Sequence, residues 1–181
     1  MTDPTNRVPV FELHVRPLFR LLDREHMLDQ FDLWDLQSVW TNRAQILDAV
    51  SGSRMPPSTK GGPWPAEFVQ LFQRWIATGT DAQTGHHLLL AVPQGSYSVA
   101  LSGDAVSVSA KVVAPTHGCR VWFDMQLITE TDRTYTLYLE PAYPEGPAAP
   151  QVLPVVESFP KNSITKVIVY DSKGRQEFPV S

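Results

Sequence analysis

Histidine and cysteine are the side chains in this sequence best suited to nucleophilic, acid–base or metal chemistry. His117 and Cys119 stand two positions apart, so one metal ion or one base–thiol pair could use both. No second dense pair of ligand residues accompanies them, and neighbouring His86 and His87 would point to opposite faces of an extended chain. The sequence therefore predicts no metal site and a buried structural thiol at Cys119.

Established catalytic motifs are missing from the sequence. It contains no Gly-x-Ser-x-Gly, no phosphate-binding loop and no dinucleotide fingerprint. An enzyme of small-molecule or natural-product metabolism is an alternative interpretation, with its pocket at the junction of two domains. Its polar groups, chosen by residue type alone, would be His26, His87, His117, Asp124 and Tyr138.

Helical periodicity marks the first part of the chain. Apolar residues recur at helical spacing in three segments, which are Phe11 to Leu22, Val39 to Val50 and Phe68 to Ile76. Asp35 or Ser38 suits the N-cap of the second helix, and Pro65 suits the start of the third. We therefore expect three short helices joined by loops that contain proline.

Apolar and polar residues alternate after residue 86, which is typical of strands with one face exposed to water. The predicted strands cover 96–101, 106–113, 120–128, 134–139, 164–170 and 176–180. Prolines clustered over 141–160 predict loops, with 141–150 as an exposed connection. The expected fold class is α+β: a helical domain (1–80), a linker (81–86) and an antiparallel β-sandwich (87–181).

Three short phrases in the helical part resemble those of c-type cytochrome domains. They are Arg16-Pro-Leu-Phe19, Met55-Pro-Pro57 and Arg74-Trp-Ile-Ala-Thr-Gly79, and the similarity covers about residues 9–80. Where that family attaches haem through Cys-x-x-Cys-His, this chain has Leu22-Asp-Arg-Glu-His26. The resemblance thus implies a cytochrome c-like scaffold that has lost its covalent haem.

A haem held without thioether bonds is a further hypothesis that follows from the resemblance. His26 and Met55 would be its axial ligands, since a His/Met pair is a known ligation for electron carriers. Asp23, Arg24 and Glu25, however, place three charges where an apolar pocket wall is needed. We therefore expect no cofactor.

Charge and hydropathy exclude several classes of partner. The 15 basic and 19 acidic residues give a net charge of −4, whereas a nucleic-acid-binding surface needs a basic stripe. No segment approaches the roughly 18 apolar residues of a membrane span, and the N-terminus lacks an apolar signal core. We expect a cytoplasmic protein that binds neither nucleic acid nor membranes.

Tryptophan supplies the strongest remaining signal, with five residues in the chain. Trp34 and Trp64 lie beside turns, and tryptophan is enriched at binding hot spots. The alternative is that they pin loops onto the core. Our main functional prediction is a non-catalytic accessory or binding subunit. It would dock on a partner enzyme or on a second copy of itself through loops rich in tryptophan and proline.

Overall fold

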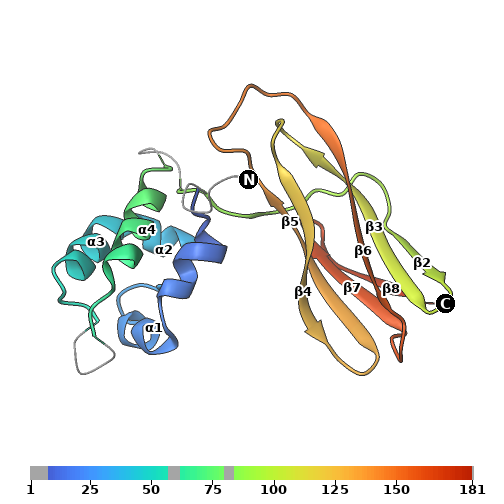
Figure 1. The fold of residues 1–181 in the computed structure, drawn as a ribbon, viewed down its shortest axis with the longest axis horizontal. Helices are drawn as coiled ribbons and strands as arrows, with labels where there is room; N and C mark the ends of the chain where they lie inside the picture. The colour runs from blue at the N-terminus through green and yellow to red at the C-terminus, as the bar shows by residue number, and fades with distance from the viewer. Residues whose placement is uncertain (1–7, 57–61, 80–83, 181) are drawn as a thin grey trace. The chain divides into compact units, whose positions relative to one another are not determined.

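The protein divides into two compact units, Met1–His87 and Leu88–Ser181. The computed structural model describes residues 8–56, 62–79 and 84–180. Helices form the first unit and strands the second, so the fold is α+β as predicted (Figure 1). The boundary between the units follows His87, one residue after the end of the predicted linker. Residues 81–83 of that linker lie outside the described residues.

Short helices joined by turns build the first unit. In chain order they are a π-helical turn (Phe11–Val15), a 3₁₀ turn (Arg16–Leu18), α1 (Leu21–Met27), α2 (Leu36–Thr41), α3 (Arg43–Ser51) and α4 (Ala66–Ile76). Of the two predicted caps for the second helix, Asp35 is the N-cap and Ser38 is not, and the predicted helix is divided at Asn42 into α2 and α3; the predicted start of α4 at Pro65 is confirmed. The Asp35 carboxylate accepts a hydrogen bond from the Ser38 amide at 2.8 Å, and Pro65 precedes α4. Each spares the helix an unsatisfied terminal N–H group.

Trp75 on α4 is the centre of the helical core. It is fully buried and packs against Phe11, Trp40 and Phe72, with ring centroids 5.4 to 5.7 Å apart. Its indole N–H donates to the carbonyl of His86 at 3.1 Å. The backbone passes so close to this ring that a Cβ added at Gly85 would lie 2.6 Å from it. Glycine is therefore required there for close packing.

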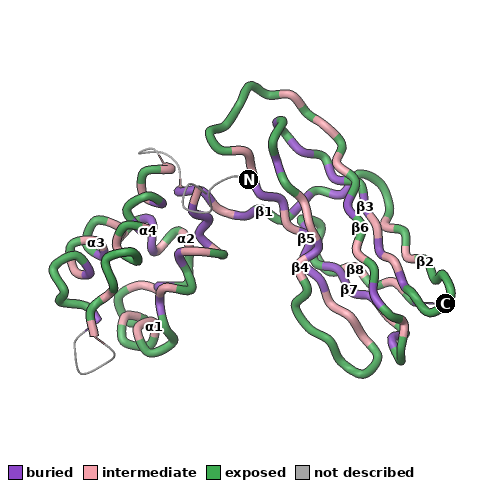
Figure 2. The backbone as a smooth tube through the Cα atoms, viewed as in Figure 1, coloured by how far each residue is buried: buried purple, intermediate pink, exposed green. Residues whose placement is uncertain are grey.

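Eight strands form the second unit. They are β1 (Leu89–Leu90), β2 (Ser98–Ser102), β3 (Ala105–Ala114), β4 (Arg120–Ile128), β5 (Asp132–Glu140), β6 (Gln151–Pro160), β7 (Lys166–Asp171) and β8 (Gly174–Pro179). One sheet contains β2-β3-β6; the other contains β1-β5-β7-β8, with β4 also paired to β5. Val108 of the first sheet and Leu137 of the second belong to one buried core, so the sheets share their interior (Figure 2).

Two features of this unit correct the prediction. Strands β5 and β7 pair in parallel, with Tyr135 opposite Val169, so the sandwich is not purely antiparallel. Residues 151–160, predicted as loop because of their prolines, form strand β6 along the full length of β3. Strand β6 is the last strand of its path, and an edge strand tolerates proline because its outer N–H groups need no partner.

Candidate binding pocket of the helical unit

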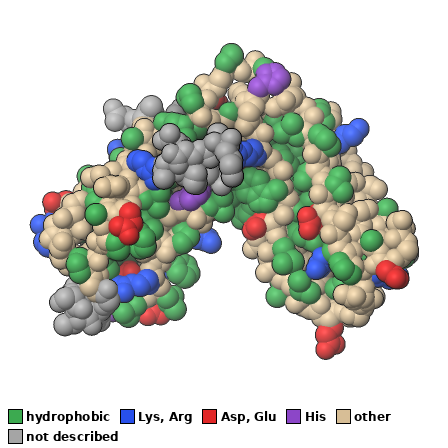
Figure 3. Space-filling model, viewed as in Figure 1, with side chains coloured by type: hydrophobic (Ala, Val, Ile, Leu, Met, Phe, Trp, Pro, Cys, Tyr) green, Lys and Arg blue, Asp and Glu red, His purple; other side chains and the backbone are tan. Residues whose placement is uncertain are grey.

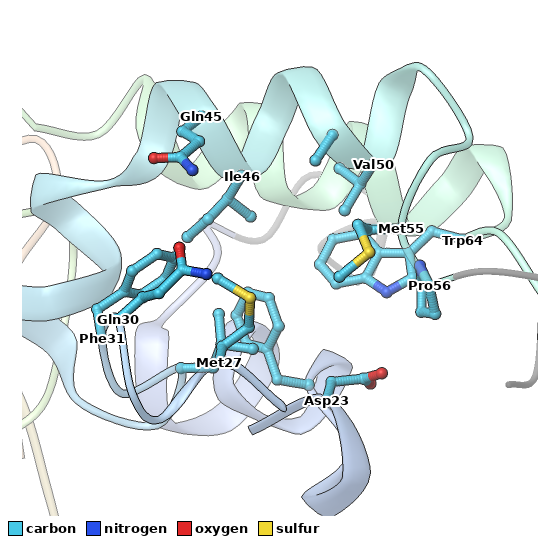
Figure 4. Close-up of a pocket in the computed structure, with 13 residues that line it drawn as sticks. Asp23, Met27, Gln30, Phe31, Gln45, Ile46, Val50, Met55, Pro56 and Trp64 are labelled. Carbon is cyan, nitrogen blue, oxygen red and sulfur yellow. The ribbon is translucent and has the colours of Figure 1, made fainter. Parts of the chain in front are cut away.

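A pocket of about 220 Å³ lies within the helical unit, between α1 with its following loop and α3 (Figure 4). Most of its wall is apolar. The lining residues are Phe19, Asp23, Met27, Gln30, Phe31, Leu33, Gln45, Ile46, Ala49, Val50, Met55, Pro56 and Trp64. All of them come from one unit, so the pocket belongs to the helical unit alone.

Helical spacing explains how α1 and α3 supply the two sides of the pocket. Ile46 and Val50 are four residues apart on α3, and Asp23 and Met27 are four apart on α1. Side chains at this spacing lie one above the other on the same helix face. One face of each helix therefore lines the pocket, apolar on α3 and formed by one carboxylate and one thioether on α1.

Aromatic packing holds the Trp64 wall in place. The Trp64 ring lies 5.3 Å from Phe19, 6.0 Å from Phe72 and 6.3 Å from Phe68, measured between ring centroids. The last two pairs are nearly perpendicular, which is a favoured geometry for aromatic pairs. Trp64, one of the two predicted binding tryptophans, therefore has a fixed position at the edge of the pocket.

Three polar side chains lie at the pocket: Asp23, Gln30 and Gln45. The Asp23 carboxylate accepts from the Arg20 guanidinium at 2.8 and 2.9 Å and from the Arg20 amide at 3.0 Å. This pairing raises the pKa of Arg20. Because the one charged side chain among the described lining residues is already paired, this part of the pocket offers an uncharged ligand apolar contacts and two amides.

The predicted haem ligands are not brought together around this pocket. Met55 borders it, but His26 is exposed on α1 and is not among the lining residues. The His26 Nδ1 atom lies 2.7 Å from the Leu22 carbonyl oxygen. Pockets that enclose drug-sized ligands have volumes of roughly 300–1,000 Å³. The volume of this pocket, about 220 Å³, is below that range, and a haem molecule is larger than most drug-sized ligands. The described residues therefore do not fit haem.

Trp34, the other predicted binding tryptophan, fastens the loop between α1 and α2. Its indole N–H donates to the Phe19 carbonyl at 2.9 Å, and the Arg24 guanidinium lies 4.7 Å from its ring centroid. Arg24 also forms a two-bond ion pair with Asp32, with both N–O distances 2.7 Å. These contacts support the loop-pinning alternative for Trp34.

The Arg24–Asp32 pair gives the helical unit an acid-sensitive contact. Hydrogen bonds from Arg24 and from the Trp34 amide lower the pKa of Asp32 to about 2. An unfolded aspartate titrates near pH 3.9. The contribution of this carboxylate to stability is therefore complete above about pH 4 and is lost as the pH falls towards 2.

We expect Asp32→Asn to flatten the fall in stability of the helical unit between about pH 4 and pH 2, because asparagine does not titrate. Urea unfolding at several pH values, followed by the hydrogen exchange of α1, measures this. Asp29→Asn removes an exposed carboxylate from the same loop and is the matched control. An equal flattening in both variants would contradict the assignment.

The remaining predicted catalytic residues are divided between the two units. His87 ends the helical unit, whereas the other three belong to the strand unit. His117 is exposed, with its Nδ1 3.2 Å from the Gln151 side-chain oxygen. Tyr138 pairs with Trp122, which is two residues before Asp124 on β4. Residues two apart on a strand point to the same face, so Asp124 and Tyr138 lie diagonally across one face of the sheet. The Asp124 carboxylate accepts from Gln126 at 2.6 Å.

Cys119 is buried, as expected for a structural thiol. Its sulfur lies 3.4 Å from the hydroxyl oxygen of Thr116, which is also buried. Within residues 8–56, 62–79 and 84–180, no three histidine, cysteine or acidic residues gather in a way that could hold a metal ion. In the same ranges, no helix has the length and apolarity needed to cross a membrane.

Two residues that the sequence singled out line the pocket: Met55, predicted as a haem ligand, and Trp64, predicted as a binding residue. The rest of the pocket wall was not predicted. The missed residues include Met27, Phe31, Ile46 and Val50, which the sequence shows only as apolar positions of helices and loops. Such residues are ordinary core material in any helical protein. The nearest signal was the pair of methionines, a residue type enriched at adaptable binding surfaces.

Comparison with known proteins leaves the family open. No family model, no curated protein and no solved structure matches the chain. The resemblance to c-type cytochromes therefore stays a prediction, and the candidate site stands on its geometry alone.

Proposed function

We propose that this protein is a non-catalytic accessory subunit that binds a partner, or a second copy of itself, through the pocket of its helical unit. The observation that carries the proposal is the pocket of about 220 Å³ with a mostly apolar wall. Met55, Pro56 and Trp64 on that wall belong to the tryptophan- and proline-containing region predicted to dock. An apolar group of the partner would fill the pocket and exclude water from it.

The distribution of titratable groups supports binding over catalysis. General acid–base or nucleophilic chemistry needs a titratable or nucleophilic side chain that is positioned within hydrogen-bond reach of the substrate. Among the lining residues that the structure describes, the one carboxylate, Asp23, is already paired with Arg20. His117, Asp124 and Tyr138 belong to the other unit. An enzyme with a pocket at the junction of the units remains an alternative hypothesis.

The surface charge supports a protein partner over a nucleic acid. On the face shown in Figure 3, Lys and Arg side chains are scattered and do not gather into one basic patch. The net charge of −4 agrees with this distribution. Nucleic-acid binding depends on clustered cations that neutralise phosphates.

We also propose that the helical unit is a cytochrome-like scaffold whose haem site became this smaller pocket. Two segments support the idea. Met55, where the resemblance implies an axial ligand, borders the pocket. The Leu22–His26 segment, where it implies haem attachment, lies on α1, contains the pocket-lining Asp23 and directly precedes the pocket-lining Met27.

The test of docking compares two Ala→Phe variants of α3. Ala49 lines the pocket, whereas Ala44 is exposed on the same helix and is not among the lining residues. We expect Ala49→Phe to fill the pocket and weaken binding of the purified partner at least about tenfold, and Ala44→Phe to leave it unchanged. A tenfold change corresponds to about 1.4 kcal/mol of binding free energy.

The partner is obtained by cross-linking in the native host, then purified and titrated against each variant by calorimetry. Light scattering of the chain alone measures self-association in parallel. Near-UV circular dichroism confirms that both variants are folded. Equal binding by wild type, Ala49→Phe and Ala44→Phe, or no partner and no self-association, would overturn the proposed docking.

A further inference from the structure

We infer that the group held by the helical pocket is an uncharged aromatic ring system of one or two fused rings. The inference rests on the proposed function in taking the pocket as the binding site, and it adds the chemical class of the ligand. Three properties of the pocket support it: its volume, the side chains on its wall and the absence of an unpaired charge among the described residues that line it.

The volume sets the size of the ligand. An engineered apolar cavity of about 150 Å³ takes up a benzene molecule. The present pocket, at about 220 Å³, is larger by about half. One aromatic ring therefore fits with room to spare, and a fused pair of rings such as indole matches the space more closely.

The wall of the pocket favours aromatic over aliphatic ligands. Met27 and Met55 place thioethers on it, and thioether sulfur makes favourable contacts with aromatic rings. Figure 4 shows the Met27 sulfur at the cavity, with the Phe31 ring near one end and Trp64 at the other. An aromatic ligand could meet these rings edge to face, an arrangement that stabilises aromatic pairs beyond simple burial.

Charge and hydrogen bonding narrow the class further. Asp23 is already paired with Arg20, so a cationic ligand finds no free counter-charge among the lining residues. An anionic ligand would lose its hydration without gaining a cation from the described lining residues. The side-chain amides of Gln30 and Gln45 lie at the pocket, and each can accept or donate a hydrogen bond. A neutral ring with one N–H or O–H group can contact the apolar wall and form a hydrogen bond with one of these amides.

The experiment titrates the full chain with matched probes by calorimetry and ligand-observed NMR. The aromatic probe is indole, and the charged analogues are indole-3-acetate and tryptamine. Cyclohexanol is a neutral alicyclic probe that also carries one hydroxyl group. We expect indole to bind with a dissociation constant of roughly micromolar to submillimolar, the range of efficient small ligands. The other three are expected to bind at least about tenfold more weakly.

Variants connect the binding to this pocket. Ala49→Phe is expected to abolish indole binding, and its matched control Ala44→Phe to leave it unchanged. Met55→Leu replaces the thioether by a hydrocarbon of similar volume, so indole binding should weaken by roughly two- to tenfold while cyclohexanol binding is unaffected. Because leucine is a conservative replacement, this variant keeps the test valid if Ala49→Phe fails to fold.

Two results would overturn the inference: no indole binding to folded wild-type protein, or binding of cyclohexanol or a charged analogue as tight as that of indole. The capped amide N-acetyl-tryptophanamide distinguishes the source of the ring. If N-acetyl-tryptophanamide binds as tightly as indole, the pocket holds a tryptophan side chain of a partner. If indole binds but N-acetyl-tryptophanamide does not, the pocket holds a free small molecule. A partner that docks with an aliphatic anchor would refute this inference while leaving the proposed function intact.

Discussion

Replacing Trp75 by alanine is expected to unfold the helical unit while the strand unit stays folded. The side chain is fully buried, contacts three other aromatic rings and donates a hydrogen bond to the His86 carbonyl. Truncating a buried tryptophan costs about 3–5 kcal/mol through lost burial and the cavity left behind. The other unit has its own core, so its strands should keep their protection.

Hydrogen exchange measured by mass spectrometry resolves this effect by segment. Amides of α2, α3 and α4 should exchange much faster in Trp75→Ala, and those of β3 and β5 should be unchanged. Trp34→Ala is the matched control, because it removes the same side chain from a position 37% exposed. Equal loss of protection in both variants, or simultaneous loss in both units, would show that Trp75 is not the centre of an independent core.

Removing the hydroxyl of Tyr97 is expected to destabilise the strand unit by about 1.5–3 kcal/mol. The Tyr97 hydroxyl donates to the buried Asp171 carboxylate at 2.7 Å, and the Lys173 amide donates to the other carboxylate oxygen at 2.6 Å. Tyr97→Phe leaves one oxygen of a buried carboxylate without its donor, and hydrogen bonds to charged groups are among the strongest. Chemical unfolding followed by the exchange of β3 and β7 measures the loss.

The same contact predicts how stability changes at high pH. Burial and the neighbouring Asp171 carboxylate raise the pKa of Tyr97. An unfolded tyrosine ionises near pH 10, while the folded one stays protonated. Its contribution is thus complete below about pH 10 and is lost as the pH rises above that value.

Tyr97→Phe should therefore make the loss of stability above pH 10 less steep. Some slope should remain, because burial also raises the pKa of Tyr135. Tyr170, which is 41% exposed, provides the control Tyr170→Phe. Identical pH profiles for wild type and Tyr97→Phe, or an equal stability loss in both variants, would refute the role of this hydrogen bond.

Local sequence signals predicted much of the fold. Asp35 and Pro65 marked two helix starts because capping depends on residues adjacent in the chain. Alternating residues predicted β3 because a strand with one buried face repeats every two positions. These signals need no knowledge of what the rest of the chain does.

The errors arose where distant neighbours decide the structure. Strand β6 contains Pro154 and was predicted as loop. It nevertheless pairs with β3 along one edge, and its other edge has no neighbouring strand that would need its N–H groups as hydrogen-bond donors. The parallel pairing of β5 and β7 was missed because alternation indicates a strand without indicating its direction.

The sequence by itself therefore determined the α+β class, two helix starts and most of the strands, and it singled out Met55 as a haem ligand and Trp64 as a binding residue. Only the tertiary structure decided that these two share an apolar pocket with α1 and α3, and that His26 does not line it. Periodicity records which face of an element is apolar. Whether such faces close into a solid core or leave a cavity depends on how side chains from separate elements fill the space between them.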